Sequence, residues 1–195
     1  MTNYEKIKRI CDSNNGMITA SMASEENIAS WYLTDMVKKN QLIRVERGIY
    51  LNDGGDQDEY YFFQLKNRRC IYSFSSALYL HSMTDRVPFR KEVTVYKGYN
   101  SSHVKDDTTI HYVDKSIYEM GITECLTVFG NAVRTYNKER TICDLIANRK
   151  NIDTEIFTKA LKNYASDPEH DYRKLRKYAA KMKISEKVDS ILEIL

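Results

Sequence analysis

The first fifty residues alternate between helical and extended patterns in an order that few small folds share. Three segments predict helices, from apolar residues at helical spacing or from a capping residue at the start, and a short extended piece follows the first of them. The helical segments are residues 2–13, 19–26 and 28–40, and the extended piece is 17–18. Residues 42–51 then alternate apolar and polar side chains around Gly48, which predicts a β-hairpin. This order predicts a winged helix-turn-helix over residues 1–52.

The rest of the chain predicts a second domain of mixed structure. Residues 53–59 are acidic, contain two glycines and lack a periodic apolar face, so we expect a linker there. Residues 60–195 combine helical and strand patterns, which places the chain in the α+β class with a mixed α/β C-terminal domain. We expect helices at 60–66, 74–83, 138–148, 153–165, 170–183 and 186–195, and strands at 92–97, 108–113, 126–129 and 132–136.

The third helix of the predicted winged helix carries its apolar residues on one side. At about 100° per residue, Leu33, Met36 and Val37 fall together and, with Ile28, would pack on the first two helices. The other side carries groups that suit phosphates, base edges and thymine methyls. The candidate DNA-binding residues of this helix are Ser30, Trp31, Thr34, Lys38 and Lys39. The alternative for Trp31 is packing against the wing or the second domain.

The predicted hairpin supplies two further candidates. Arg44 and Arg47 lie on its strands and tip, and Gly48 permits the tight turn between the strands. Arginine at a wing tip suits a phosphate or a minor groove. We therefore add Arg44 and Arg47 to the DNA-binding candidates, with solvated surface charges as the alternative.

The net charge of +3 conceals an uneven distribution. Lys and Arg total 30 against 27 for Asp and Glu, yet the acidic segment 53–59 offsets two basic regions, the winged helix and the helix at 170–183. In that helix the apolar stripe is Tyr172, Leu175, Ala179 and Met182. The basic residues around it predict a second surface for nucleic acid or a partner, with a solvated face as the alternative: Arg173, Lys174, Arg176, Lys177 and Lys181.

No pattern in the sequence predicts catalysis, a metal site or a cofactor. The four cysteines lack the spacing of a zinc site and predict reduced thiols: Cys11, Cys70, Cys125 and Cys143. A serine–histidine–aspartate set occurs at Ser75, Ser76, His81 and Asp85, but without a G-x-S-x-G elbow. We expect His81 to be a hydrogen-bonded packing residue. The acidic pair Asp106-Asp107 has no third acid at ligand spacing and predicts a loop before a strand. We expect a protein that is not an enzyme.

The helix at 138–148 has a clear beginning and a clear apolar stripe. Asn137 is placed to cap its N-terminus, and Ile142, Leu145 and Ile146 would be buried. Arg140 and Asp144 are four residues apart, and we expect them to pair on the surface.

Four segments of the chain resemble AbiEi-type antitoxins. They are residues 14–51, Ser75–His81, Thr84–Pro88 and Glu139–Ile146. The resemblance implies a bacterial antitoxin of a type IV system, linked to abortive phage infection and encoded beside a nucleotidyltransferase-like toxin. It implies an N-terminal domain that represses its operon by binding inverted repeats in the promoter, and a C-terminal domain that counters the toxin. The sequence departs from many relatives in the turn, where they place Gly near the position of Asn27; Asn tolerates the same left-handed backbone.

The remaining expectations concern location and alternatives. The N-terminus lacks the apolar region of a signal peptide and no apolar run could span a bilayer, so we expect a cytoplasmic protein without membrane contact. No heptad is present, so we expect a monomer in solution. The alternatives to an autorepressing antitoxin are a ligand-responsive winged-helix regulator and an enzyme acting on nucleic acid.

Overall fold

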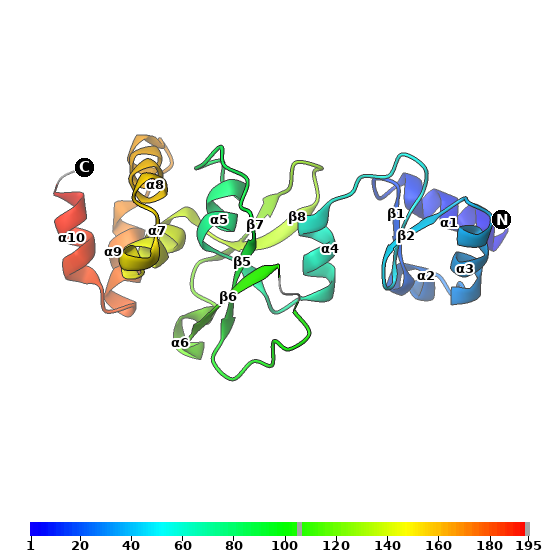
Figure 1. The fold of residues 1–195 in the computed structure, drawn as a ribbon, viewed down its shortest axis with the longest axis horizontal. Coiled ribbons are helices and arrows are strands. Elements are labelled where there is room, and N and C mark those ends of the chain that lie inside the picture. Colours follow the sequence, from blue (N-terminus) through cyan, green and yellow to red (C-terminus); the bar gives the residue numbers. More distant parts are fainter. Residues whose placement is uncertain (105–106, 194–195) are drawn as a thin grey trace. The chain divides into compact units, whose positions relative to one another are not determined.

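The computed structural model describes residues 1–104 and 107–193, which form two compact units (Figure 1). Unit 1 is Met1–Phe62 and unit 2 is Phe63–Leu195. Residues 53–58 contain neither helix nor strand, and the boundary between the units falls within the helix that follows them, α4 (Glu59–Lys66).

Unit 1 is a winged helix-turn-helix, as the sequence predicted. Its elements are α1 (Asn3–Asp12), β1 (Met17–Thr19), α2 (Ala20–Glu25), α3 (Ser30–Lys38), β2 (Ile43–Glu46) and β3 (Ile49–Leu51). Strand β3 lies between β1 and β2 and pairs antiparallel with both. The strands β2 and β3 form the wing, with Arg47 and Gly48 at its turn.

Local side-chain chemistry sets where the helices of unit 1 begin and end. The Thr2 hydroxyl accepts from the Glu5 amide and the Glu5 carboxylate accepts from the Thr2 amide, a capping box that starts α1. The Thr19 hydroxyl accepts from the Met22 amide and starts α2. Asn27 has a φ of +57°, so the left-handed turn expected at this position is present between α2 and α3.

The core of unit 1 confirms the predicted inward side of α3. Leu33 and Met36 are buried and pack with Ile28 from the turn before the helix, while Val37 is half-buried beside them. The other helices and the wing contribute Ile7, Cys11, Ile18, Ala23, Leu42 and Tyr50.

Unit 2 is built on a five-stranded mixed sheet. The strands are β4 (Ile71–Tyr72), β5 (Lys91–Tyr96), β6 (Thr108–Val113), β7 (Ile122–Leu126) and β8 (Ala132–Tyr136). Their order is β6-β5-β4-β8-β7, with β5–β6 and β4–β8 parallel and β4–β5 and β7–β8 antiparallel. The predicted α+β class is confirmed.

The helices of unit 2 gather mainly at its C-terminal end. They are α4, α5 (Phe74–Leu80), α6 (Lys115–Tyr118), α7 (Lys138–Ala147), α8 (Thr154–Ser166), α9 (Tyr172–Lys181) and α10 (Ser185–Leu192), with a 3₁₀ turn at Arg149–Asn151. Helix α5 and helices α7 to α10 share one apolar core, which runs from Phe74 and Leu78 to Val188. Figure 1 shows α7 to α10 in yellow to red.

Two elements of this unit were not predicted, and one predicted strand was misplaced. Strand β4 and helix α6 were not expected, because two and four residues are too few to show a periodicity. The hairpin around Gly130-Asn131 exists, but its first strand is Ile122–Leu126 rather than 126–129. Residues 127–129 belong to the turn, where the Thr127 amide donates to the carbonyl of Asn131. The end predicted for the last helix, at residue 195, lies outside the described residues.

The expected surface pair of Arg140 and Asp144 is instead fully buried. Every residue from Glu139 to Ile146 is buried, because the sheet, α5 and the later helices enclose α7. The Arg140 side chain is 0% exposed, and its Nε donates to Asp144 Oδ1 at 3.0 Å. The guanidinium also donates to the carbonyls of Ile117 and Met120 and lies 4.2 Å from the ring centre of Tyr136.

Arg140 joins α7 to the segment before β7, because its guanidinium donates to the carbonyls of Ile117 and Met120. Burial raises the pKa of the Asp144 carboxyl, and the Arg140 charge opposes that shift. Gly121, with a φ of +83°, lies so close that a β-carbon there would come within 2.7 Å of the Arg140 β-carbon. Asn137 caps α7 as predicted, since its Oδ1 accepts from the Arg140 amide at 3.0 Å.

Removing one partner of this pair should destabilise the protein strongly. We expect Asp144→Ala to lower the free energy of unfolding by about 3–5 kcal/mol, because Arg140 would keep a buried charge without a counter-ion. Urea denaturation of the full chain followed by circular dichroism measures the change. The control is Asp189→Ala, which breaks an exposed pair with Arg176 and should cost no more than about 1 kcal/mol. Equal effects of the two variants would contradict this role of the buried pair.

Candidate nucleic-acid interface

The apolar core of unit 1 fixes which side chains α3 presents outward. With Leu33 and Met36 held inside, Ser30, Trp31, Thr34 and Lys38 are exposed. No side chain caps the helix at Ala29, and Ala29 and the first two helical residues are exposed. The first-turn amides of such a helix end are suitable donors to a phosphate.

Trp31 is the largest exposed group of this helix. Its side chain is 54% exposed, and its ring stacks on that of Tyr32 with centroids 3.9 Å apart. Tyr32 in turn meets the ring of Tyr4 edge-on at 5.2 Å. The indole therefore rests on an aromatic support anchored in α1 while much of its surface stays open to solvent.

Asp35 and Lys39 form an ion pair at the edge of this surface. Asp35 accepts from the Tyr4 hydroxyl at 2.7 Å and lies 2.7 Å from Lys39 Nζ. The Lys39 ammonium also lies over the Tyr4 ring, 4.9 Å from its centre. The hydrogen bonds from Lys39 and Tyr4 lower the pKa of the Asp35 carboxyl. Lys39 therefore has an acidic partner within unit 1, whereas Lys38 has no ion pair among the described residues.

The wing holds its two arginines at the surface. Arg44 is exposed, and its Nε donates to the carbonyl of Glu46 at 3.4 Å. Arg47 occupies the turn, is exposed and forms no ion pair within the described ranges 1–104 and 107–193. The Gly48 carbonyl accepts from the Ala20 amide at 2.9 Å, which ties the wing turn to the start of α2.

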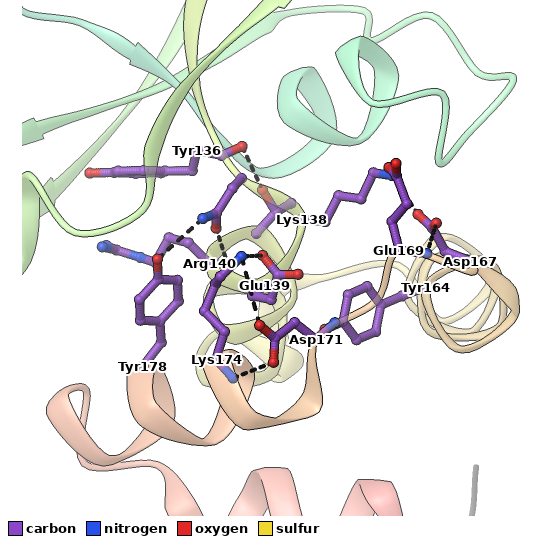
Figure 2. Close-up of polar contacts among 12 residues, drawn as sticks. Tyr136, Lys138, Glu139, Arg140, Tyr164, Asp167, Glu169, Asp171, Lys174 and Tyr178 are labelled. Carbon is purple, nitrogen blue, oxygen red and sulfur yellow. Dashed lines mark hydrogen bonds and ion pairs between the residues drawn. The ribbon is translucent and has the colours of Figure 1, made fainter.

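Two of the basic side chains of α9 are held in ion pairs that the sequence did not predict. Figure 2 shows Lys174 of α9 beside Glu139 of α7 and Asp171, the residue that caps α9. Lys174 Nζ lies 3.6 Å from Glu139 Oε2, and Glu139 is buried. Arg176 pairs with Asp189 of α10 at 3.0 Å. The predicted apolar stripe is confirmed, with Leu175 and Ala179 buried and packed in the shared core.

Three of the five basic residues remain without an ion pair in the described part of the chain. They are Arg173, Lys177 and Lys181, all exposed. Their spacing of four residues puts them in one row along α9. Two cations of α9, Lys174 and Arg176, are therefore held in ion pairs. The other three form an exposed row, which we call the open row.

The residue types of a catalytic triad are not brought together. The Ser76 hydroxyl accepts from the Glu92 amide, and Asp85 pairs with Lys159 at 2.6 Å. His81 Nε2 bonds the carbonyl of Tyr136 at 2.7 Å, which confirms its predicted packing role. Burial lowers the pKa of this imidazole.

The cysteines form no disulfide. All four cysteines are free thiols, and Cys125 is half-buried with its sulfur 3.3 Å from His81 Nδ1. That contact joins α5 to β7 and had no signal in the sequence. Among the described residues no group of three or more His, Cys, Asp and Glu side chains could hold a metal ion. Asp107 directly precedes β6, while Asp106 lies outside the described residues.

Sequence reasoning also missed a cavity of about 460 Å³ in unit 2. It is bordered by α5, β5, β6, α8 and the segment Thr84–Arg90, part of which the sequence analysis noted only as a family resemblance. The signal in the sequence was an unusual run of two arginines around Val87, Pro88 and Phe89.

None of the helices in the described part of the chain has the length and hydropathy of a membrane-spanning segment.

Comparison with protein families identifies a family model that matches most of unit 1. Residues 5–52 match the model of a family described as "Transcriptional regulator, AbiEi antitoxin". The N-terminal winged helix is of the AbiEi antitoxin type. The matched residues span α1 to the end of the wing, which are the elements that present Trp31, Thr34, Lys38 and Arg47.

The fold of the chain has a counterpart among solved structures. A structure described as "Crystal structure of RV2827C protein from Mycobacterium tuberculosis" aligns with a TM-score of 0.54 at 7% sequence identity. The alignment covers 97% of this chain and 80% of the other. At this identity the likeness concerns the fold alone. No curated protein matched the chain.

Proposed function

We propose that this protein is an antitoxin and autorepressor whose winged helix binds inverted repeats in the promoter of its own operon. The observation that carries the proposal is the outward side of α3, where Trp31, Thr34 and Lys38 are exposed in a domain of AbiEi regulator type. In this arrangement α3 enters the major groove and the wing follows the adjacent backbone.

The chemistry of the interface divides between affinity and sequence choice. Lys38, Arg44 and Arg47 carry charges that suit phosphates, and such contacts supply affinity without sequence information. Ser30 and Thr34 offer hydroxyls to base edges, and the Trp31 indole offers an apolar surface and one N–H donor. Lys39 contributes less than Lys38, because Asp35 already offsets its charge.

The proposed regulator acts in the cytoplasm as a monomer, with one copy on each half of an inverted repeat. Residues 60–195 counter a nucleotidyltransferase-like toxin encoded beside it, and the protein acts by binding rather than by catalysis. A ligand-responsive regulator without a toxin is the alternative. Co-expression with the neighbouring gene distinguishes the two, since only an antitoxin relieves growth arrest caused by that gene.

Substitutions in unit 1 should separate affinity from discrimination. We expect Arg47→Ala to weaken binding to all duplexes alike and to reduce the slope of log K against log salt by about 0.9, the value for one lost phosphate contact. Thr34→Ala and Trp31→Ala should lower the ratio of operator to non-specific affinity, by about 1–3 kcal/mol if each loses a base contact. Fluorescence anisotropy at several salt concentrations measures both quantities.

Lys162→Ala is the matched control, since Lys162 is an exposed cation of α8 in unit 2. It should leave affinity, salt slope and discrimination unchanged. Operator binding that is independent of salt, or discrimination that survives both α3 substitutions, would contradict the proposed interface.

The open row of α9 favours a second contact with nucleic acid. We propose that Arg173, Lys177 and Lys181 hold a phosphate backbone, because each is exposed and none has an acidic partner among the described residues. Lys174 instead stabilises the helical part of unit 2 through the buried Glu139, while Asp189 offsets the charge of Arg176 in an exposed pair.

This division of α9 predicts different outcomes for neighbouring lysines. The triple variant Arg173→Ala, Lys177→Ala, Lys181→Ala should weaken non-specific binding to duplex or RNA and reduce the salt slope by up to about three phosphate contacts. Lys174→Ala should change nucleic-acid affinity little and lower the urea midpoint, because it removes the partner of a buried carboxylate. An unchanged salt slope in the triple variant would leave α9 a solvated face and contradict the second contact.

A further inference from the structure

The cavity of about 460 Å³ in unit 2 has the size and lining of a small-molecule site. Its volume lies within the range of ordinary ligand pockets, roughly 300–1,000 Å³. Leu78 is fully buried at its wall, and Ile156 of α8 contributes further apolar surface. The hydroxyl-bearing residues Ser75, Thr84 and Thr109 are half-buried around it. An apolar wall with a few polar groups is typical of sites for organic ligands.

Phe89 places an aromatic ring in solvent at this cavity. Its side chain is 100% exposed, and the neighbouring Val87 is 64% exposed. A ring in this position contributes nothing to the apolar core. It presents a flat π-surface on which another planar group can stack.

The charge of the lining is positive. Arg86 and Arg90 are both exposed lining residues, and neither forms an ion pair with any residue in 1–104 or 107–193. The cavity also contains one carboxylate, Glu92, which is already held by His111 at 2.8 Å. Two free guanidinium groups at one cavity suit a ligand with phosphate oxygens, which arginine binds through paired N–H donors.

We propose that this cavity binds a nucleoside phosphate, with the base stacked on Phe89 and the phosphates held by Arg86 and Arg90. The aromatic face, the two guanidinium groups and the hydroxyls match the three parts of such a ligand. The inference goes beyond the proposed DNA binding of unit 1 and does not depend on it. A free nucleotide and a nucleotide within a single strand present the same groups.

Isothermal titration of the full chain tests the site. The probes for a free nucleotide are ATP, GTP, CTP and UTP. Adenosine and inorganic triphosphate, the two parts of ATP, are titrated separately. A short single-stranded oligonucleotide is the probe for a nucleotide within a single strand. We expect at least one nucleotide to bind with a Kd below about 1 mM. Adenosine and inorganic triphosphate should each bind more weakly than ATP.

Substitutions assign the binding to the cavity. Phe89→Ala should weaken nucleotide binding roughly 5- to 150-fold, as expected for one lost stacking contact. The double variant Arg86→Ala, Arg90→Ala should abolish binding of inorganic triphosphate. These side chains are exposed, so the variants should keep the circular dichroism and urea midpoint of the natural sequence. Val128→Ala and Arg68→Ala are the matched controls, exposed residues outside the cavity lining that should have no effect.

The possible outcomes separate this site from the interface of unit 1. Binding of the oligonucleotide alone, lost in Phe89→Ala, supports the site and identifies a single strand as the source. Trp31→Ala should leave nucleotide binding intact even where it alters operator binding. The proposal is overturned if no probe binds, if binding survives both sets of substitutions, or if adenosine binds as tightly as ATP.

Discussion

Burial of one side of α3 is the constraint on which the proposed DNA-binding surface depends. Leu33 and Met36 are held in the core of unit 1 with Ile28, and the left-handed backbone at Asn27 allows the chain to turn sharply into this helix. Because an α-helix is rigid, fixing its inner side also fixes the outward positions of Trp31, Thr34 and Lys38. A change at Leu33 would therefore alter the interface without touching DNA.

Unit 2 depends on a different kind of interaction. Its central helix α7 is enclosed on all sides and carries a guanidinium group into the interior, where Asp144, two backbone carbonyls and the Tyr136 ring receive it. Such a network costs desolvation, and here that cost is only partly offset, since Arg140 Nη2 and Asp144 Oδ2 are buried without a hydrogen-bond partner among the described residues. The neighbouring N-terminal turn of α7 then carries Glu139, which holds Lys174 and so joins α9 to the same centre (Figure 2).

The success of prediction from sequence followed the length and regularity of each element. The winged helix, the inner side of α3, the Asn137 cap and the apolar stripe of α9 all rest on local periodicity or capping chemistry, and all were predicted correctly. Burial of Arg140 was missed because a pair four residues apart looks the same on a surface helix and on an enclosed one. The ion pairs of Lys39, Lys174 and Arg176 depend on other side chains brought close by folding. The cavity beside Phe89 likewise exists only once α5, α8 and the sheet are in place.

The single tryptophan allows a direct test of the central claim, that the outward side of α3 contacts promoter DNA. In a ¹⁵N-labelled full-length sample the Trp31 side chain gives one indole N–H resonance. Titration with a duplex from the promoter of its operon should shift or broaden that resonance together with the backbone amides of α3 and the wing. If saturating duplex leaves the indole and the α3 amides unchanged while resonances of unit 2 move, unit 1 is not the operator-binding domain.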